Sequence, residues 1–418
     1  MHTLDLKTLV RLARNGSSFY AGLYRDLPPD FTLEDLPLIA QEEYWEAAKT
    51  ENNRVLTSMQ ADGIVYTSGG TTGAPKYTCF SRADIGTMMD FTSIAMMRSG
   101  LTSGDRIANY FHAGNMYASF ACAHDYLCNV PVGVVVYPIA YVTPVPEAVQ
   151  LIIRHGINAI LLLPSSAIQI FDHVKQAGIK DFPIRKLFYA GEAFYEDQRK
   201  MVREAAPGIE IHSAFYGSVD GGIIGFCDPT CGFNEHRAYD DAAIMEIVDE
   251  DTGEVIRETE REGKIVVTAL YRTLMPVIRY PSGDLGMWKE PEGTPNRKFM
   301  LLGRANEGAR ISHFFLRYND MMTVFHNLRD QLTVFDFQIV VEHSDEKDHL
   351  TLNVALDKGD ASGEMKEIII QGMFRQFDEW NMRSSGAIPG INFVRKEELE
   401  YNPRTGKLKR VIDRRLKK

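Results

Sequence analysis

The stretch "YTSGGTTGAPKYT", residues 66–78, decides how the rest of the chain is interpreted. Glycines and small hydroxyl residues are typical of a loop whose backbone N–H groups and hydroxyls surround phosphate oxygens. The phosphate loop of nucleotide kinases needs Gly, four residues and then Gly-Lys-Ser/Thr. Here the residue five after Gly69 is Ala74, and Lys76 is followed by Tyr77. The stretch therefore predicts a phosphate-binding loop of another kind.

Upstream of about residue 242, short β-branched runs alternate with helical patterns. Helical patterns such as "VPEAVQLIIRHG" separate four predicted strands, at Gly133–Pro138, Ala159–Pro164, Lys186–Gly191 and Ile211–Ser218. This alternation is typical of parallel sheet covered by helices, and ligands of such sheets gather outside the carboxyl ends of strands. We therefore expect an α/β fold with a site at the turns "TSGG", "AGE" and "YGS".

Two further regions follow. From Ala242, "AIMEIVDEDTGEVIRE" predicts a hairpin with a Thr-Gly turn, and the next segment is extended, which suggests a distorted β-barrel subdomain. From Gly303 the pattern reads helix (317–331), strand, strand, helix (364–380), strand, close to a small ferredoxin-like α+β domain. We expect a large N-terminal domain, 1–304, and a small C-terminal domain, 305–418.

Composition restricts the class of protein. The net charge of −10 argues against binding nucleic acid or an anionic membrane, and only the tail "GKLKRVIDRRLKK", read as a solvated final helix or a functional segment, is strongly basic. Five cysteines in 418 residues suggest a reducing compartment. The most apolar stretch, Val130–Val142, is shorter than the roughly 20 residues of a membrane span, and the N-terminus lacks a signal-like apolar core. We expect a cytoplasmic protein.

The opening stretch resembles a family signature. "TSGGTTGAPK" is similar to the [ST]SG[ST]TGxPK motif of adenylate-forming enzymes, with Gly70 at the usual Ser/Thr place. Five later segments resemble further motifs of that superfamily in the same order: "AGEAF" (190–194), "YGSVDGG" (216–222), "RYPSGDLG" (279–286), "LLGRANEGARIS" (301–312) and "PRTGKLKRVID" (403–413). The N-terminal "LVRLARNGSSFYAGLY" resembles the phenylacetate–CoA ligase branch, so the resemblance covers essentially the whole chain.

The resemblance implies that the N-terminal domain, 1–304, binds ATP and the acid and that the C-terminal domain, 305–418, is a mobile lid. It also implies a set of site residues for ATP and Mg²⁺. Lys407 would approach the α-phosphate as the catalytic residue, Asp220 would help to hold Mg²⁺, Asp284 would bind the ribose hydroxyls, and Arg304 would add a second contact. The remaining residues that the motifs assign to ATP or AMP are Ser68, Gly69, Gly70, Thr71, Thr72, Gly73, Lys76, Ala190, Gly191, Glu192, Tyr216, Gly217 and Ser218. Tyr216 would lie on the adenine.

Simpler interpretations stand beside these roles. Asp284 would serve equally as a turn aspartate, Tyr216 as a core aromatic, and Lys407 as a solvated lysine of the tail. Lys409 is close enough to be confused with Lys407, although the preceding Gly406 favours the latter.

The chain departs from the family pattern in three places. Asp220 replaces the usual glutamate, and Asn306 stands where the hinge usually carries Asp or Lys. After the hinge, "RISHFFLRYND" has Phe314 and Phe315 but no glycine, where phenylacetate–CoA ligases have a glycine-containing loop that lines the pantetheine tunnel. We expect these rings to obstruct pantetheine, so the acceptor is open.

Two further groups of residues suggest sites. Cys227, Cys231 and His236 have a loose metal-ligand spacing and would hold a structural Zn²⁺ if a fourth ligand came from elsewhere; a pair of ordinary reduced thiols is the alternative. His112 and Met116, with the adjacent Tyr117, stand where the family's acyl pocket begins, although aromatics at such spacing are often core residues.

The sequence thus predicts an ATP-dependent ligase, acid–thiol or acid–amine, that activates an aromatic or aryl-acetic acid. Its small-molecule partners would be that acid and an acceptor, CoA or an amine. Two alternatives stay open. One is a phenazine-type enzyme of antibiotic biosynthesis, similar to the griseoluteate-activating type, that does not use CoA. The other is a catalytically weak nucleotide- or metabolite-binding protein. The sequence does not distinguish a monomer from a homodimer.

Overall fold

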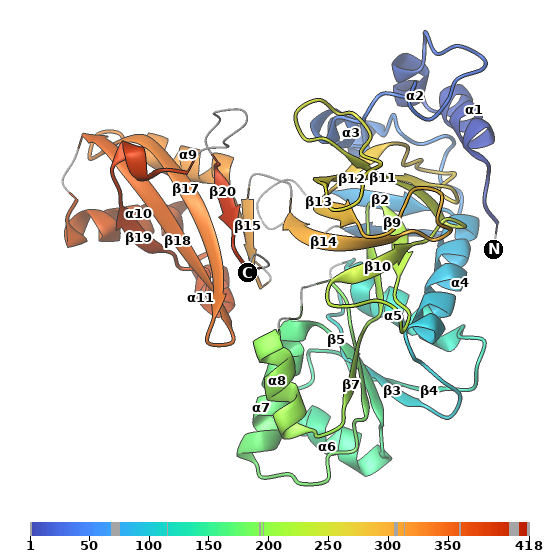
Figure 1. The fold of residues 1–418 in the computed structure, drawn as a ribbon, viewed down its shortest axis with the longest axis horizontal. Coiled ribbons are helices and arrows are strands. Elements are labelled where there is room, and N and C mark those ends of the chain that lie inside the picture. Colours follow the sequence, from blue (N-terminus) through green and yellow to red (C-terminus); the bar gives the residue numbers. More distant parts are fainter. Residues whose placement is uncertain are drawn as a thin grey trace. The chain divides into compact units, whose positions relative to one another are not determined.

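The structure is a computed structural model that describes residues 2–67, 76–114, 116–191, 194, 196–304, 308–312, 314–358, 361–400 and 409–415 (Figure 1). These residues fall into two compact units, one that extends to Leu302 (unit 1) and one from Gly303 onward (unit 2). The expected roles of an ATP- and acid-binding domain and a mobile lid stay predictions. No helix in the described part of the chain is long and apolar enough to cross a membrane.

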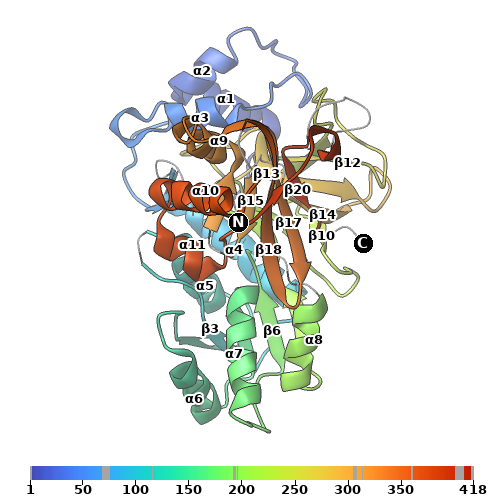
Figure 2. The same cartoon turned by 90° about the vertical axis from the view of Figure 1, so that its left-hand side faces the viewer.

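A five-stranded parallel sheet forms one part of unit 1, in the strand order β4-β3-β5-β6-β7. Its strands are β3 (Arg106–Asn109), β4 (Val135–Pro138), β5 (Ala159–Leu162), β6 (Lys186–Tyr189) and β7 (Glu210–Ser213). The connecting helices are α5 (Ala118–Cys128), α6 (Val145–His155), α7 (Pro164–Gln176) and α8 (Glu196–Ala205), of which α7 and α8 lie side by side (Figure 2). The parallel α/β pattern predicted from the sequence is confirmed.

The central strand β5 shows why these residues form a parallel sheet. All four of its side chains are fully buried. Ile160 and Leu162 belong to the apolar cluster that includes α6, α7 and α8, whereas Ala159 and Leu161 belong to the cluster on the other face. A strand covered on both faces needs a continuous apolar run, which "AILL" supplies.

The strand order also fixes where a ligand would bind. The chain proceeds from β3 outward to β4 and then returns to β5 on the other side of β3. In sheets of this kind the crevice lies outside the carboxyl ends of the strands at this reversal point. The segments after Asn109 and Leu162 therefore border the expected crevice.

The second sheet of unit 1 has the order β11-β12-β13-β14-β10-β9-β8, and its pairs β11–β12, β12–β13, β14–β10, β10–β9 and β9–β8 are antiparallel. Its strands are β8 (Phe215–Ser218), β9 (Gly222–Phe226), β10 (Glu235–Ala238), β11 (Ala243–Val248), β12 (Glu262–Ala269), β13 (Tyr280–Trp288) and β14 (Lys298–Arg304). A barrel requires its edge strands to pair. In the described residues the edges β11 and β8 do not pair, so the predicted distorted barrel is an open sheet.

The predicted strand 211–218 is in fact two strands in different sheets. The break falls at Ala214, which is fully buried and donates its N–H to the carbonyl of Tyr189 at 2.8 Å. A single residue therefore carries the chain from the parallel sheet into the antiparallel sheet.

The N-terminal part of unit 1 contains α1 (Leu6–Gly16), α2 (Ser18–Leu23), α3 (Gln41–Ala47), the 3₁₀ turn η1 (Thr50–Asn52) and α4 (Arg82–Arg98). Between η1 and α4, the strands β1 (Ile64–Thr67) and β2 (Tyr77–Phe80) pair antiparallel, with Thr67 opposite Tyr77. The residues between these two strands are those of the opening sequence stretch. Its predicted loop is therefore flanked by a hairpin.

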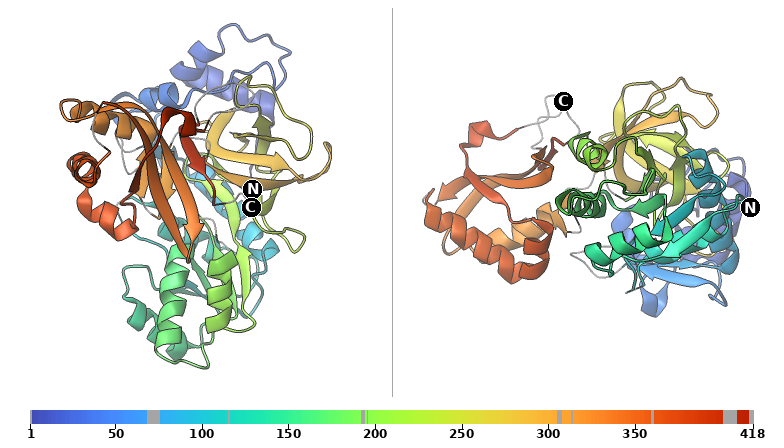
Figure 3. Two further views of the ribbon diagram at one scale, coloured as in Figure 1. Left: turned by 60° about the vertical axis from the view of Figure 1, so that its left-hand side comes forward. Right: turned by 90° about the horizontal axis from the view of Figure 1, so that it is seen from below.

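Unit 2 is a small α+β unit, as predicted. Its four-stranded sheet has the order β19-β18-β17-β20, and helices cover one face of it (Figure 3). The elements are β15 (Gly308–Ile311), β16 (Phe314–Arg317), α9 (Tyr318–Asn327), β17 (Thr333–Ser344), β18 (Lys347–Lys358), α10 (Gly363–Gln376), α11 (Glu379–Ser385), β19 (Gly390–Phe393), the 3₁₀ turn η2 (Lys396–Glu398) and β20 (Val411–Asp413).

Two expectations for unit 2 are corrected. The predicted helix 364–380 divides into α10 and α11, because Asp378 accepts the N–H of Asn381 and starts a new helix. The basic tail is not a solvated helix at Val411–Asp413, since these residues pair in parallel with β17.

The central strand gives a stability prediction. Leu161→Ala should lower the free energy of unfolding of unit 1 by about 2–5 kcal/mol, because it removes a fully buried side chain from the core. Urea unfolding followed by tryptophan fluorescence measures this in a Trp380→Phe background, because the other two tryptophans, Trp45 and Trp288, both lie in unit 1.

The matched control is Val142→Ala, whose side chain is 84% exposed and whose effect should stay within about 0.5 kcal/mol. A Leu161→Ala variant as stable as this control would contradict the central position of β5.

Candidate active site

Two residues that the motifs assign to adenine and ribose lie in contact. Tyr216 on β8 donates its hydroxyl proton to Asp284 Oδ2 on β13 at 2.7 Å, and Ser282 Oγ lies 3.2 Å from the same hydroxyl. Ser282 Oγ also accepts the backbone N–H of Asp284 at 3.2 Å. Because three strands separate β8 from β13 in the sheet order, this contact requires the open sheet to curl.

The turn from β8 to β9 can be built only with glycine at its end. Gly222 has φ +75°, and a Cβ there would lie 1.9 Å from the hydroxyl oxygen of Tyr271. That oxygen accepts the N–H of Ile223 at 2.9 Å, so it is fixed in place. The predicted residues Gly217 and Ser218 lie at the start of the same turn, where Ser218 Oγ accepts the N–H of Gly221. The turn therefore holds Asp220 in one place.

Asp220 lies between the hairpin and the second sheet. Its Oδ2 accepts a proton from the Tyr280 hydroxyl at 3.3 Å, and its Oδ1 lies 3.5 Å from Thr78 Oγ1 on β2. Burial raises the pKa of Tyr280 well above its usual value, and the nearby Asp220 carboxylate raises it further, so this hydroxyl stays protonated. The fully buried Arg272 donates to the carbonyls of Asp220 and Cys79, at 3.0 and 3.3 Å. A carboxylate oxygen is a suitable donor for Mg²⁺.

The predicted acid-pocket residues follow β3, at the reversal point of the parallel sheet. His112 stacks on Tyr141, with ring centroids 3.9 Å apart and planes at 27°. Met116 has φ 58° and accepts the N–H of Thr67 with its carbonyl at 3.0 Å, which joins this segment to the end of β1. Met116 and Tyr117 are 49% and 39% exposed, so neither is a core residue.

Ala190 and Gly191 follow β6, at the same edge of the parallel sheet. Gly191 has φ +82°, and a Cβ there would lie 3.2 Å from Leu163 Cδ2. The preceding Tyr189 accepts a hydrogen bond from Arg199 Nη2 at 2.6 Å. The turn expected beside the adenine therefore lies at the carboxyl edge.

Several predicted residues lie outside the described part of the chain. Lys76 is described, and its Nζ lies 5.0 Å from the centroid of the Trp45 ring. Arg304 is described only as the last residue of β14. The residues outside are Ser68, Gly69, Gly70, Thr71, Thr72, Gly73, Glu192, Asn306 and Lys407. Their roles stay predictions.

The two phenylalanines after the hinge have different environments. Phe314 is 2% exposed and packs against Phe377 in the core of unit 2, with ring centroids 5.5 Å apart. Phe315 is only half-buried, and its ring passes over Gly308, where a Cβ would lie 2.7 Å from Cζ. The expectation that both rings obstruct pantetheine is therefore wrong for Phe314, whose side chain is in the core.

The predicted zinc ligands do not form a metal site in the described residues. His236 Nε2 lies 2.8 Å from Ser213 Oγ, and the Cys227 thiol donates to the carbonyl of Glu235 at 3.2 Å. No group of three or more His, Cys, Asp or Glu side chains in the described ranges is arranged to hold a metal ion. The Cys227–Cys231 contact raises the pKa of Cys227 and lowers that of Cys231, and burial adds to the rise at Cys227. Two reduced thiols, the alternative left open by the sequence, fit this arrangement.

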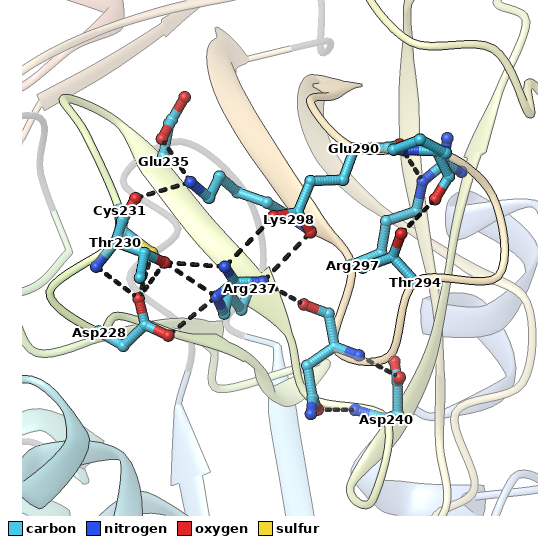
Figure 4. Close-up of polar contacts among 12 residues, drawn as sticks. Asp228, Thr230, Cys231, Glu235, Arg237, Asp240, Glu290, Thr294, Arg297 and Lys298 are labelled. Atoms are coloured by element: carbon cyan, nitrogen blue, oxygen red, sulfur yellow. Dashed lines mark hydrogen bonds and ion pairs between the residues drawn. The ribbon is translucent and has the colours of Figure 1, made fainter.

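A polar network holds the loop between β9 and β10 of the second sheet (Figure 4). Arg237 on β10 donates to Asp228 Oδ2 at 2.9 Å and to both carboxylate oxygens of Glu290 at 3.2 Å. Thr230 Oγ1 accepts a further bond from Arg237 at 2.8 Å. This network gives the loop that carries Cys231 a fixed shape.

Sequence reasoning did not identify the residues that hold the start of β13. Arg279 has φ 47° and forms a buried ion pair with Glu246 at 2.9 Å. Tyr280 and Ser282 stand inside the segment "RYPSGDLG", so the motif pointed to their place but not their contacts. Arg272 and Glu246 carry no motif and become visible only in the fold.

His236 gives a pH prediction. Burial lowers its pKa from 6.5 to about 4, so the folded chain keeps it neutral while the unfolded chain takes up a proton below 6.5. Stability should therefore fall as the pH falls from about 6.5 to 4, by on the order of 3 kcal/mol from this residue. Thermal or urea unfolding at several pH values should show a shallower decline for His236→Gln than for the parent.

The control is His155→Gln, since His155 is exposed on α6. This variant should keep the parent's pH dependence. A His236→Gln variant with an unchanged decline between these pH values would contradict the neutral, buried histidine.

Residues 26–271 match the sequence model of a family described as AMP-binding enzyme. Indoleacetate–lysine synthetase from Pseudomonas savastanoi is 26% identical over 263 residues, which is 61% of each chain. Phenylacetate–coenzyme A ligase from Aromatoleum evansii is 25% identical over 246 residues, 58% of this chain and 54% of that one. The chain thus aligns with less than two thirds of either relative.

Solved structures are similar over a longer range. A 2-hydroxyisobutyryl-CoA ligase in complex with 2-HIB-AMP and CoA has a TM-score of 0.73 at 18% identity, covering 98% of this chain and 88% of that one. An amide bond synthetase from Marinactinospora thermotolerans has a TM-score of 0.54 at 16% identity, covering 83% and 67%. At these identities the similarity establishes the fold.

Proposed function

The chain belongs to the AMP-binding enzyme family, and from that membership we propose that it is an adenylate-forming ligase. An oxygen of the acid's carboxylate attacks the α-phosphorus of ATP, the bond to the β-phosphate oxygen breaks, and pyrophosphate leaves. The acyl group then passes to a thiol or an amine, and AMP is released.

One observation carries the proposal: the 2.7 Å hydrogen bond between Tyr216 and Asp284. It joins two motifs 68 residues apart in the sequence, one assigned to adenine and one to ribose. A nucleoside needs an aromatic face for the base and an acceptor for its hydroxyls, and this pair supplies both. The Asp284 carboxylate can accept both ribose hydroxyl protons when a nucleotide binds.

The phosphates would lie between the flanking hairpin and the Asp220 turn. Ser68, Thr71 and Thr72 would donate to the β- and γ-phosphates, while Asp220 would help to hold Mg²⁺, which neutralises phosphate charge. Because both reactants are anions, alignment and charge neutralisation are the main requirements of the site. Lys407 would supply positive charge at the α-phosphate.

The acid is proposed to be aromatic or aryl-acetic. His112, Met116 and Tyr117 supply an aromatic and thioether wall at the reversal point of the parallel sheet, and two of them are exposed. The relatives named for phenylacetate and indoleacetate act on acids of this class. These observations support an aryl ring beside His112.

The acceptor is proposed to be CoA or an amine. The names of the relatives include both kinds of product, a coenzyme A ligase and a lysine synthetase. Because Phe314 packs in the core, only Phe315 remains as a bulky ring that could affect access by pantetheine. Mass spectrometry of the product formed with CoA or with lysine distinguishes these acceptors, and a phenazine-type enzyme would form no thioester.

Acid-dependent exchange of labelled pyrophosphate into ATP tests adenylation itself. Lys407→Ala should slow this exchange by at least about 100-fold, because it removes the charge expected at the α-phosphate. The matched control is Lys409→Ala, since the Lys409 ammonium pairs with Glu400 at 3.4 Å. This control should exchange at close to the parent rate.

A full-rate Lys407→Ala variant would refute the assignment of that lysine. If the parent itself exchanges no pyrophosphate with a broad panel of aryl acids, the weak nucleotide-binding alternative replaces the ligase.

Asp284 gives a prediction about nucleotide selectivity. Asp284→Ala should lower kcat/KM for ATP by about 10- to 100-fold, because a hydrogen bond to a charged carboxylate is lost. The preference for ATP over 2′-deoxy-ATP should shrink in the same variant, since the ribose contact sets that preference. Exchange rates with both nucleotides check this.

Asp181→Ala, at an exposed aspartate of the same unit, is the control and should keep the parent's preference. If Asp284→Ala discriminates between the two nucleotides as strongly as the parent, the ribose assignment is wrong.

A further inference from the structure

We propose that Trp45, on the short helix α3, is a positioning residue for the triphosphate and its metal ion. Its indole contacts Lys76, at the end of the phosphate loop, and Tyr280, which bonds to Asp220. The inference rests on the proposed function, because it concerns the same ATP site.

Helix α3 is fixed on the start of β13. Gln41 Nε2 donates to the carbonyl of Pro281 at 2.7 Å, and Trp45 Nε1, one turn later on the same side, donates to the Tyr280 hydroxyl at 3.0 Å. Tyr44 packs its ring against Tyr280, with centroids 5.5 Å apart, and donates to the carbonyl of Pro276 at 3.0 Å. These contacts give the half-buried Trp45 a defined place.

The indole N–H of Trp45 determines to which acceptor the Tyr280 hydroxyl donates its proton. An indole nitrogen can only donate, so the Tyr280 oxygen accepts from Trp45 and directs its own proton elsewhere. That proton points to Asp220 Oδ2 at 3.3 Å. Trp45 therefore acts through Tyr280 to orient the carboxylate that would hold Mg²⁺.

The face of the Trp45 ring contacts a second residue, Lys76, at the end of the phosphate loop. Lys76 Nζ lies 5.0 Å from the ring centroid, within the distance at which an ammonium is attracted to an aromatic face. Lys76 directly precedes β2, which also carries Thr78, the second residue near Asp220. Trp45 is thus linked to both elements between which the triphosphate would lie, to the hairpin through Lys76 and to the Asp220 turn through Tyr280.

Trp288 offers a comparison within the same unit. Its indole N–H donates to the carbonyl of Ile256 at 3.1 Å, and Arg297 lies 4.4 Å from its ring centroid. It therefore makes the same two kinds of contact as Trp45, a donated hydrogen bond and a cation over the ring, but neither of these two partners is a predicted site residue. Trp288→Phe is a matched control.

The experiment measures equilibrium binding of MgATP by calorimetry, without any acid, at a series of Mg²⁺ concentrations. Trp45→Phe keeps a ring near Lys76 but loses the indole N–H. Tyr280→Phe loses the hydroxyl that connects this N–H to Asp220. Each should raise the half-saturating Mg²⁺ concentration by about 3- to 10-fold, the effect of one hydrogen bond. The double variant should be no weaker than Tyr280→Phe alone, since the indole acts through that hydroxyl.

Trp45→Leu removes the aromatic face as well and should weaken ATP binding a further 2- to 5-fold, roughly the worth of one exposed cation–π contact. Trp288→Phe should bind like the parent, and the binding stoichiometry shows that each variant is folded. Equal effects of Trp45→Phe and Trp288→Phe, or fully additive effects of Trp45→Phe and Tyr280→Phe, would overturn the inference.

The outcomes separate this inference from the proposed function. A parent that binds MgATP but exchanges no pyrophosphate contradicts the ligase, while the Trp45 comparison is still decided by binding. A parent that exchanges pyrophosphate and whose Trp45 variants bind MgATP normally contradicts only the role of Trp45. A parent that binds no MgATP contradicts both.

Discussion

A single buried residue, Ala214, joins the five-stranded parallel sheet of unit 1 to its seven-stranded antiparallel sheet, and the candidate site depends on this joint. Strand β7 ends at Ser213 and β8 begins at Phe215, so no connecting loop separates the sheets. The Ala214 N–H is bonded to the carbonyl of Tyr189, which fixes the joint to the neighbouring strand. Tyr216 therefore has a set position relative to the carboxyl edge, where the turns after β3 and β6 also lie.

The second constraint is the set of buried polar contacts that hold Arg279, the residue directly before β13. Arg279 adopts a left-handed backbone conformation, which costs on the order of 1–3 kcal/mol and persists only when its surroundings hold it. Here Glu246 forms an ion pair with the Arg279 guanidinium, and Thr268 Oγ1 accepts the backbone N–H of Arg279 at 2.9 Å. Removing one partner of such a buried pair typically costs about 3–5 kcal/mol. The strain stands directly before the segment that carries Asp284.

Much of this arrangement could be predicted from the sequence, because short runs of residues and local motifs indicate it. Apolar runs such as "AILL" and helical spacing predicted the parallel sheet, and the motifs predicted that Tyr216 and Asp284 share a site. The break at Ala214 was missed because one strand and two strands joined by a single buried residue have the same extended pattern in the sequence. The burial of Phe314 was missed because hydropathy alone does not tell which of two adjacent rings enters the core. Trp45 gave no signal, since its partner Tyr280 is 235 residues away.

In the proposed function, the acid is activated as an acyl-adenylate and not as an acyl phosphate. The most direct measurement uses an aryl acid labelled with ¹⁸O in its carboxylate, an acceptor and ATP, followed by mass spectrometry of the products. If the carboxylate attacks the α-phosphorus, one ¹⁸O atom will appear in AMP and none in pyrophosphate. Label in inorganic phosphate, or AMP without label after product has formed, would contradict activation through an acyl-adenylate.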